Sequence, residues 1–119
     1  MTIYYSPAET VESTGLSLDT LRYYEKEGLL GPIDRTAGGR RRYRQADLDW
    51  LGLVRCLRET GMPIADLKEY ARLSSDAATV DDRLTLLEAH HAHVQEAIDR
   101  LLHQQAHLRE KIAWYREQR

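Results

Sequence analysis

The sequence of 119 residues contains no phenylalanine, three prolines and a single cysteine, Cys56. One cysteine cannot form an intramolecular disulfide, which excludes the small secreted folds that depend on several such bonds. No apolar run is long enough to cross a bilayer, and the first residues, MTIYYSPAETVE, lack the basic and apolar regions of a signal peptide. Charged residues are evenly mixed and Pro and Gly are few, so disorder is not expected. We therefore expect a folded, helix-rich, cytoplasmic protein without a membrane partner.

Neither sign of charge dominates the chain. Lys and Arg total 17 and Asp and Glu total 19, and the resulting net charge of −2 argues mildly against a nucleic-acid partner. The charges are not spread evenly, however, because one stretch of five positions holds four arginines and no acidic residue: Arg40, Arg41, Arg42 and Arg44. Such a cluster is either a solvated basic loop or part of a nucleic-acid interface, and the surrounding pattern must decide.

Two short helices are expected at the start of the chain. Ser6-Pro7-Ala8-Glu9 supplies an N-cap, a proline for the first turn and a capping box, and Gly15 can end this helix in the left-handed conformation. Ser17 is an N-cap for a second helix, LDTLRYYEKE. The residues of this helix that we expect to face the core are Leu18, Leu21 and Tyr24. Two helices joined by a tight glycine turn are typical of a helix-turn-helix.

Residues 33–43, IDRTAGGRRRY, are typical of a small β-hairpin with its turn at Ala37-Gly38-Gly39. A helix-turn-helix followed by a basic hairpin predicts a winged helix, whose second helix enters the major groove of DNA. Arg22 on that helix is the candidate for base contact, because its guanidinium can form two hydrogen bonds with guanine. The arginines of the hairpin suit phosphates. The candidate DNA-contact residues are Ser17, Thr20, Arg22, Tyr23, Arg40, Arg41, Arg42 and Tyr43.

Two further helices complete this head. One is expected from Gln45 or Asp47 to about Thr60, and the next follows Pro63 over IADLKEYARL. The apolar positions of the first are Leu48, Leu51, Val54 and Leu57. The polar stretch SSDAAT then links the head to the last segment, so we expect a DNA-binding domain over residues 1–75 and a linker with a dimerisation helix over residues 76–119.

The last segment, from Val80 onward, has the most regular pattern of the chain. Eleven positions from 80 to 115 alternate by four and three residues, and nine of them are apolar or aromatic, which indicates a coiled coil. The polar exceptions, His91 and Gln105, each lie seven residues from Ile98, so an antiparallel pair centred near Ile98 would bring them together. The expected fold is mainly all-α: a winged helix-turn-helix head with a β-hairpin wing, followed by a long antiparallel coiled-coil helix that forms a homodimer.

Several of these motifs carry a family resemblance. LDTLRYYE at residues 18–25, GLL at 28–30, GRRRY at 39–43 and Asp47-Leu48 together resemble the MerR family of bacterial transcription regulators, and the resemblance extends over the whole chain. Arg40 stands where relatives commonly have tyrosine, so the contact of that position does not transfer. The resemblance implies a homodimer on double-stranded promoter DNA with an over-long spacer, which the protein distorts so that RNA polymerase engages both promoter elements.

The resemblance also implies an effector site near or beyond the end of the coiled coil, but no drug-binding domain and no cysteine pair are recognisable there. The sequence RCLRETGM around Cys56 is instead similar to the single-cysteine branch of the family, which responds to aldehydes, electrophiles or nitrosative stress. Arg55 and Arg58 adjoin the sulfur in sequence and could favour its thiolate. The alternative is a buried cysteine that packs as a small hydrophobe. A non-covalent effector, or metal on His103 and His107, is the weaker possibility.

Two other functional classes fit the sequence less well. An enzyme is not expected, because the sequence has no nucleophile–base pair and no phosphate-binding glycine loop, and no cofactor is expected either. A helical adaptor, whose coiled coil joins partners and whose head never contacts DNA, is the alternative. Arg22 and Tyr23, followed by the arginine-rich hairpin, favour the DNA-binding regulator over this adaptor.

Overall fold

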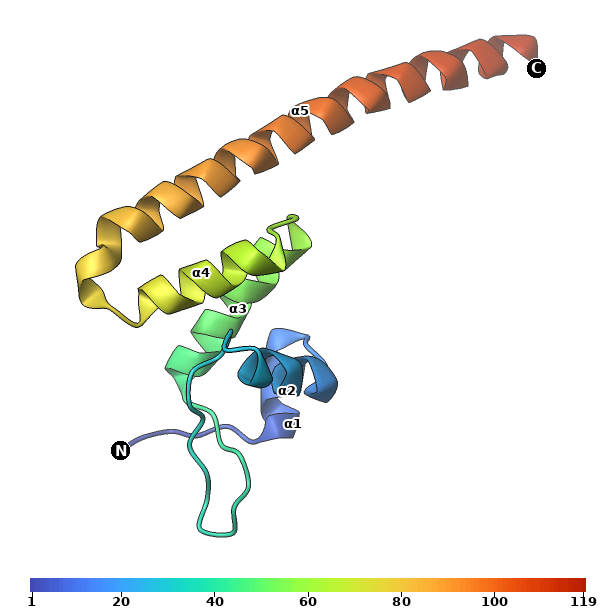
Figure 1. Ribbon diagram of the computed structural model, residues 1–119. Coiled ribbons are helices and arrows are strands. Elements are labelled where there is room, and N and C mark those ends of the chain that lie inside the picture. The colour runs from blue at the N-terminus through green and yellow to red at the C-terminus, as the bar shows by residue number, and fades with distance from the viewer. The chain divides into compact units, whose positions relative to one another are not determined.

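The computed structural model describes residues 1–119, whose contacts divide into two units, residues 1–83 and 84–119. The elements in chain order are α1 (Pro7–Thr14), α2 (Leu18–Lys26), α3 (Gln45–Glu59), α4 (Ile64–Ser74), the short 3-10 helix η1 (Ala77–Thr79) and α5 (Val80–Gln118) (Figure 1). This composition confirms the expected fold class, and no helix is long and apolar enough to span a membrane.

The first two helices begin and end as the sequence predicts. At the start of α1, Ser6 Oγ accepts the Glu9 N–H at 3.1 Å and the Glu9 carboxylate accepts the Ser6 N–H at 3.0 Å, which is the predicted capping box. Gly15 ends α1 with a φ of 74°. Ser17 caps α2 by accepting the Thr20 N–H at 3.1 Å.

Helix α3 is the centre of the head, because it contacts both α1 and α4. Its buried stripe is the one that the sequence predicts: Leu48, Leu51, Val54 and Leu57. From α2, Leu21 and Tyr24 are buried as expected, but Leu18 is 42% exposed and the expectation for this residue was wrong. Leu18 is the first residue of α2, where the helix begins outside the packed face. Helix α1 faces the core with Thr10 and Thr14, whose hydroxyls donate to carbonyls one turn earlier in the helix.

The turn between α1 and α2 is held by a side chain from α3. Arg55 Nη1 donates a hydrogen bond to the carbonyl oxygen of Thr14, the last residue of α1, and Arg55 Nε donates to Glu59 Oε1 at 2.7 Å. The arginine therefore satisfies a carbonyl that has no partner inside its own helix. The left-handed backbone at Gly15 favours glycine, and a Cβ added there would overlap Arg55 Nη1 and displace this side chain from the Thr14 carbonyl.

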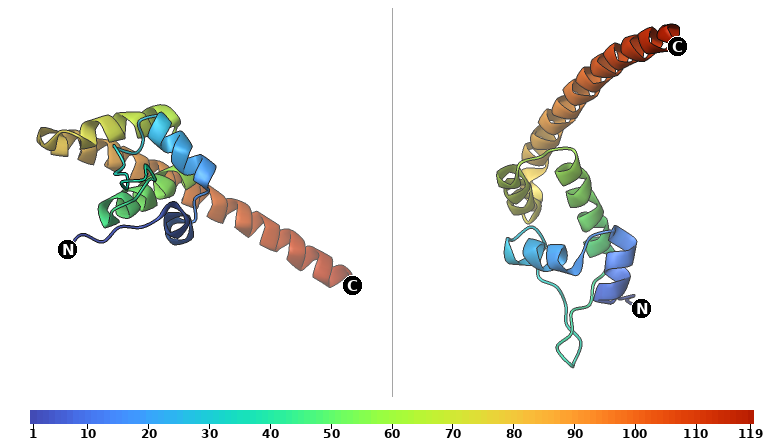
Figure 2. Two further views of the ribbon diagram at one scale, coloured as in Figure 1. Left: turned by 90° about the horizontal axis from the view of Figure 1, so that it is seen from below. Right: turned by 90° about the vertical axis from the view of Figure 1, so that its right-hand side faces the viewer.

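The predicted hairpin, which we call the wing (residues 33–43), protrudes beyond α1, α2 and α3 (Figures 1 and 2). Its two sides meet at one antiparallel bridge, Arg35 with Arg41, and the turn lies over residues 37–39 as predicted. A second bridge joins Tyr43 to Tyr5 through two backbone hydrogen bonds of 2.7 and 2.8 Å. The N-terminal arm (residues 1–6) thus pairs with the end of the wing.

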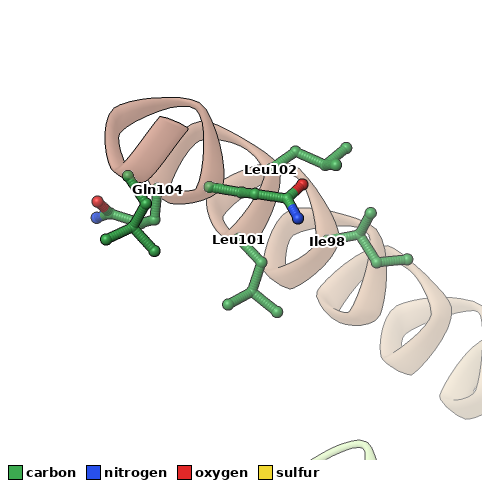
Figure 3. A pocket seen from close by; sticks show the side chains of 6 residues that line it. Ile98, Leu101, Leu102 and Gln104 are labelled. Atoms are coloured by element: carbon green, nitrogen blue, oxygen red, sulfur yellow. The ribbon is translucent and has the colours of Figure 1, made fainter. Parts of the chain in front are cut away.

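Helix α5 is continuous over 39 residues and buries no side chain. Its predicted seam includes exposed side chains along its length: Val80, Leu84, Ile98, Leu101, Leu108, Ile112 and Tyr115. Ile98, Leu101 and Leu108 also line a shallow apolar groove with Leu102, a leucine outside the predicted seam (Figure 3). An apolar face of this length needs a second helix to bury it.

The contact between Gly15 and Arg55 generates a prediction about stability. Gly28 has almost the same φ, 75°, but open space around it, so it is the matched control. Gly28→Ala should lower the free energy of unfolding by about 1 kcal/mol through backbone strain alone. Gly15→Ala should lower it by about 2–4 kcal/mol, because the Arg55–Thr14 hydrogen bond is lost as well.

Denaturant unfolding of both alanine variants, alone and combined with Arg55→Ala, measures the difference. In the Arg55→Ala background the two glycine substitutions should cost the same. Equal costs in the parent protein would contradict the interpretation.

Candidate nucleic-acid interface

The start and outward face of α2 carry four of the eight DNA-contact residues that the sequence predicts. Arg22 is exposed and forms no ion pair, and Tyr23 is 46% exposed, while Tyr24 beside it is buried in the core as expected. The hydroxyls of Ser17 and Thr20 lie at the start of the same helix and are hydrogen-bonded to each other at 2.9 Å. Around Arg22, the surface of α2 therefore presents this guanidinium, the Tyr23 ring and the hydroxyls of Ser17 and Thr20 to a partner.

The far end of α2 is tied to the rest of the head by polar contacts. Lys68 of α4 donates a hydrogen bond to Glu27 Oε2 at 2.9 Å, and this bond lowers the pKa of the Glu27 carboxyl. Just beyond the helix, the Leu29 carbonyl accepts the Trp50 Nε1–H at 2.6 Å, and the Trp50 ring stacks on Tyr70 with centroids 5.4 Å apart. These contacts fix the direction in which α2 points.

The return side of the wing is extended, so successive side chains point to opposite faces. On one face, Arg41 Nε donates to Glu25 Oε2 of α2 at 2.7 Å. Tyr43 lies on the same face and is only 2% exposed; its burial raises the pKa of its hydroxyl. This face anchors the wing to the head.

The opposite face carries Arg40, Arg42 and Arg44. Arg44 forms an ion pair with Asp34 at 2.6 Å. The Arg42 guanidinium lies over the ring of Tyr4, with Cζ 3.9 Å from the ring centroid. Arg40 is exposed and forms no ion pair. Within the cluster of four arginines, Arg40 and Arg42 are therefore the two without a carboxylate partner.

This arrangement changes the set of available side chains. Tyr43 and Arg41 were predicted to contact DNA, but the first is buried and the guanidinium of the second is paired with Glu25. The sequence could have separated the buried and paired residues from the available ones. Side chains of an extended strand alternate between its two faces, so residues 41 and 43 share one face and residues 40 and 42 share the other. Tyr4, the neighbour of Arg42, is not indicated by any residue near Arg42 in sequence.

Cys56 lies on the exposed surface of α3. This exposure overturns the alternative of a buried, core-packing cysteine. Arg55 and Cys56 are adjacent in α3, so their side chains do not face each other. The Arg55 guanidinium instead contacts Thr14 and Glu59. Arg55 therefore does not stabilise a Cys56 thiolate in the way that the sequence suggested.

The structure brings together no group of three or more His, Cys, Asp or Glu side chains that could hold a metal ion. The histidines of α5 are spread along its surface. His93 Nδ1 lies 3.6 Å from Glu96 Oε2, one turn further along the helix.

Comparison with known proteins agrees with this architecture. The family described as "MerR HTH family regulatory protein" matches residues 5–73, and the family described as "MerR, DNA binding" matches residues 48–111. An uncharacterised HTH-type transcriptional regulator of Haemophilus influenzae is 38% identical over 116 residues, which cover 95% of this chain and 84% of that protein. The HTH-type transcriptional regulator AdhR of Bacillus subtilis is 37% identical over 81 residues, 67% of this chain and 58% of that one.

A solved structure extends the likeness to three dimensions. The crystal structure of HiNmlR, a MerR family regulator lacking the sensor domain, bound to promoter DNA, superposes with a TM-score of 0.89 at 37% identity and covers 96% of this chain and 87% of that one. The relatives are transcription regulators, which confirms that the chain is not an enzyme and sets aside the adaptor that never meets DNA. The winged head, the long helix and these matches together show that the chain belongs to the MerR family of DNA-binding transcriptional regulators.

Proposed function

We propose that this regulator binds its promoter as a homodimer and activates transcription by distorting the DNA. The observation that carries the proposal is the geometry of the head: the exposed Arg22 on α2 and the unpaired Arg40 and Arg42 of the wing belong to the two elements that a winged helix presents to a duplex. The likeness to HiNmlR, whose crystal structure contains promoter DNA, supports promoter DNA as the partner.

The candidate contacts divide into two kinds. Arg22 is the base-reading residue, because a guanidinium on a helix in the major groove can form two hydrogen bonds with guanine. Ser17, Thr20 and Tyr23 surround it and suit the sugar-phosphate backbone. Arg40 and Arg42 suit phosphates beside the groove, since loop cations follow the backbone without reading sequence.

Substitution of Arg22 should test base reading. Arg22→Ala should weaken binding to promoter DNA by about 1–3 kcal/mol, which is about 5- to 150-fold, and should relax the preference for promoter over shuffled duplex. Fluorescence anisotropy with both duplexes measures the two effects. Arg116→Ala, which removes an exposed arginine from α5, is the control and should leave both unchanged. An unchanged preference in Arg22→Ala would contradict a base-reading role.

Helix α5 supports the proposed homodimer. Its apolar side chains stay exposed in the single chain, including Ile98 and the leucines of the groove in Figure 3. In an antiparallel pair centred near Ile98, Leu84 would lie opposite Ile112, and His91 opposite Gln105. The two polar positions would then meet each other in the seam and specify the register.

Disulfide crosslinking tests the antiparallel arrangement. In a Cys56→Ala background, which removes the one native thiol, the variants His91→Cys and Gln105→Cys are prepared separately and then refolded as a mixture. Oxidation should give covalent dimers only in the mixture, because each cysteine faces the other position across the seam. Efficient crosslinking of either variant alone would indicate a parallel pair and exclude this register.

The mechanism of activation follows from the family. A dimer that holds two half-sites at a fixed separation can bend and untwist the DNA between them, and the protein–DNA contacts offset the elastic cost. Over a promoter with an over-long spacer, this distortion realigns the two elements for RNA polymerase. An effector needs only to shift the balance between two dimer geometries by a few kcal/mol.

Cys56 is the proposed receiver of the signal, and its exposure supports this role because a reagent can reach the sulfur. With an aldehyde, the thiolate sulfur would add to the carbonyl carbon and the oxygen would take up a proton, giving a thiohemiacetal. Cys56 lies on α3 between Arg55, which holds the turn before α2, and Leu57, which is in the core. An adduct would therefore form on the helix that positions the DNA-reading element.

A transcription assay with and without aldehyde tests the sensor. Cys56→Ala and Cys56→Ser should keep the affinity for promoter DNA and lose the aldehyde-induced increase in transcript. Anisotropy on the same preparations shows whether binding is intact. Full induction of the alanine variant would exclude Cys56 and leave a non-covalent effector as the input.

A further inference from the structure

The N-terminal arm and the wing enclose a groove of about 410 Å³ with no acidic residue in its lining. The lining consists of Tyr4, Tyr5, Ser6, Pro7, Thr36, Arg40, Arg41 and Arg42. Arg41 is compensated by Glu25, so the uncompensated charge at the groove comes from Arg40 and Arg42. A groove of this character suits an anionic group that can also accept hydrogen bonds.

Arg42 differs from its neighbours in how it is held. Arg41 and Arg44 form ion pairs with carboxylates. The Arg42 guanidinium instead lies over the face of the Tyr4 ring, with 3.9 Å between Cζ and the ring centroid. A cation over an aromatic face is attracted by the ring quadrupole but keeps its charge uncompensated. Arg42 Nε is buried and has no hydrogen-bond partner, and it is the only nitrogen of this guanidinium in that state. The donors left for a ligand are therefore the two terminal nitrogens.

Tyr4 is itself fixed in place. The next residue, Tyr5, is paired with Tyr43 through two backbone hydrogen bonds of 2.7 and 2.8 Å, which hold the arm against the wing. The Tyr4 hydroxyl adds only a long contact of 3.5 Å to Asp34 Oδ2, so the position of the ring does not depend on it. The arm thus supplies a flat, uncharged surface at a set position beneath the wing. Without it, Arg42 would be a flexible side chain on a protruding loop, and ordering it at the DNA would cost conformational entropy.

We propose that Tyr4 is a positioning residue of the DNA interface, which holds the Arg42 guanidinium at the arm–wing groove so that its terminal nitrogens bind a phosphate of the DNA backbone. The proposal rests on the proposed function, because it takes the wing as a DNA-contacting element. It adds the N-terminal arm to the interface and gives Arg42 a phosphate rather than a base as its ligand.

A double-mutant cycle in DNA affinity tests the link between the two residues. Arg42→Ala should weaken binding about tenfold and lower the slope of log affinity against log salt by about 0.9, the value for one phosphate contact. Tyr4→Leu should weaken binding about three- to tenfold in the parent protein. In the Arg42→Ala background, Tyr4→Leu should have no further effect, because Tyr4 acts through Arg42.

Matched controls separate positioning from general damage to the fold. Tyr4→Phe keeps the ring and loses only the hydroxyl, so it should bind like the parent protein. Arg44 also lies near the Tyr4 ring, at 5.8 Å, but is held by Asp34; the effect of Tyr4→Leu should therefore persist in an Arg44→Ala background. The loss caused by Arg42→Ala should be equal on promoter and shuffled duplexes, since a phosphate contact carries no sequence information.

Each outcome decides the proposal. It is overturned if Tyr4→Leu binds like the parent protein, if its effect is the same with and without Arg42, or if Tyr4→Phe is as impaired as Tyr4→Leu. A parent protein that shows no salt-dependent binding to its promoter duplex would overturn the proposed function as well. A different result would overturn only the role of Tyr4. In that case the parent protein binds its promoter and Arg22→Ala weakens binding, but the effects of Tyr4→Leu and Arg42→Ala are additive.

Discussion

The turn that leads from α1 into α2 is held by one hydrogen bond, from Arg55 of α3 to the Thr14 carbonyl at the end of α1. The last carbonyls of a helix have no partner within it, and here a cation from the central helix takes that role. The buried face of α3 meanwhile packs the core. The same helix therefore builds the head and holds the turn from which α2 departs, and a Cβ at position 15 would displace the arginine from that turn.

The electrostatics of the head show why a count of charges is a poor guide to a nucleic-acid partner. The chain carries a net charge of −2, yet the local arrangement leaves a few cations without internal compensation. Two of the four clustered arginines are used within the protein, on Glu25 and Asp34. Those pairs hold the wing against the head, and their guanidinium groups are engaged within the protein. The two clustered arginines that have no carboxylate partner, Arg40 and Arg42, are the ones that the proposed DNA contact uses.

Much of the fold could be predicted from local signals. The capping residues of α1 and α2, the apolar stripe of α3 and the heptad pattern of α5 each depend on residues close in sequence. The site was less predictable, because it depends on contacts between distant segments. Nothing near Arg55 indicates that its guanidinium reaches Thr14, and nothing near Arg42 indicates Tyr4 as its neighbour. The burial of Tyr43 is the exception, since the alternation of an extended strand would have indicated it.

That alternation has a consequence for how the wing can vary. Neighbouring residues of the return strand serve opposite purposes, one set anchoring to α2 and the core and the other facing outward. Inserting or deleting one residue between Gly39 and Tyr43 would exchange the two sets: an arginine would be directed into the space of the buried tyrosine, although the composition of the loop would hardly change. Among homologous wings, we therefore expect length in this strand to be more restricted than residue type, and insertions to gather at the turn over residues 37–39, where they leave the register intact.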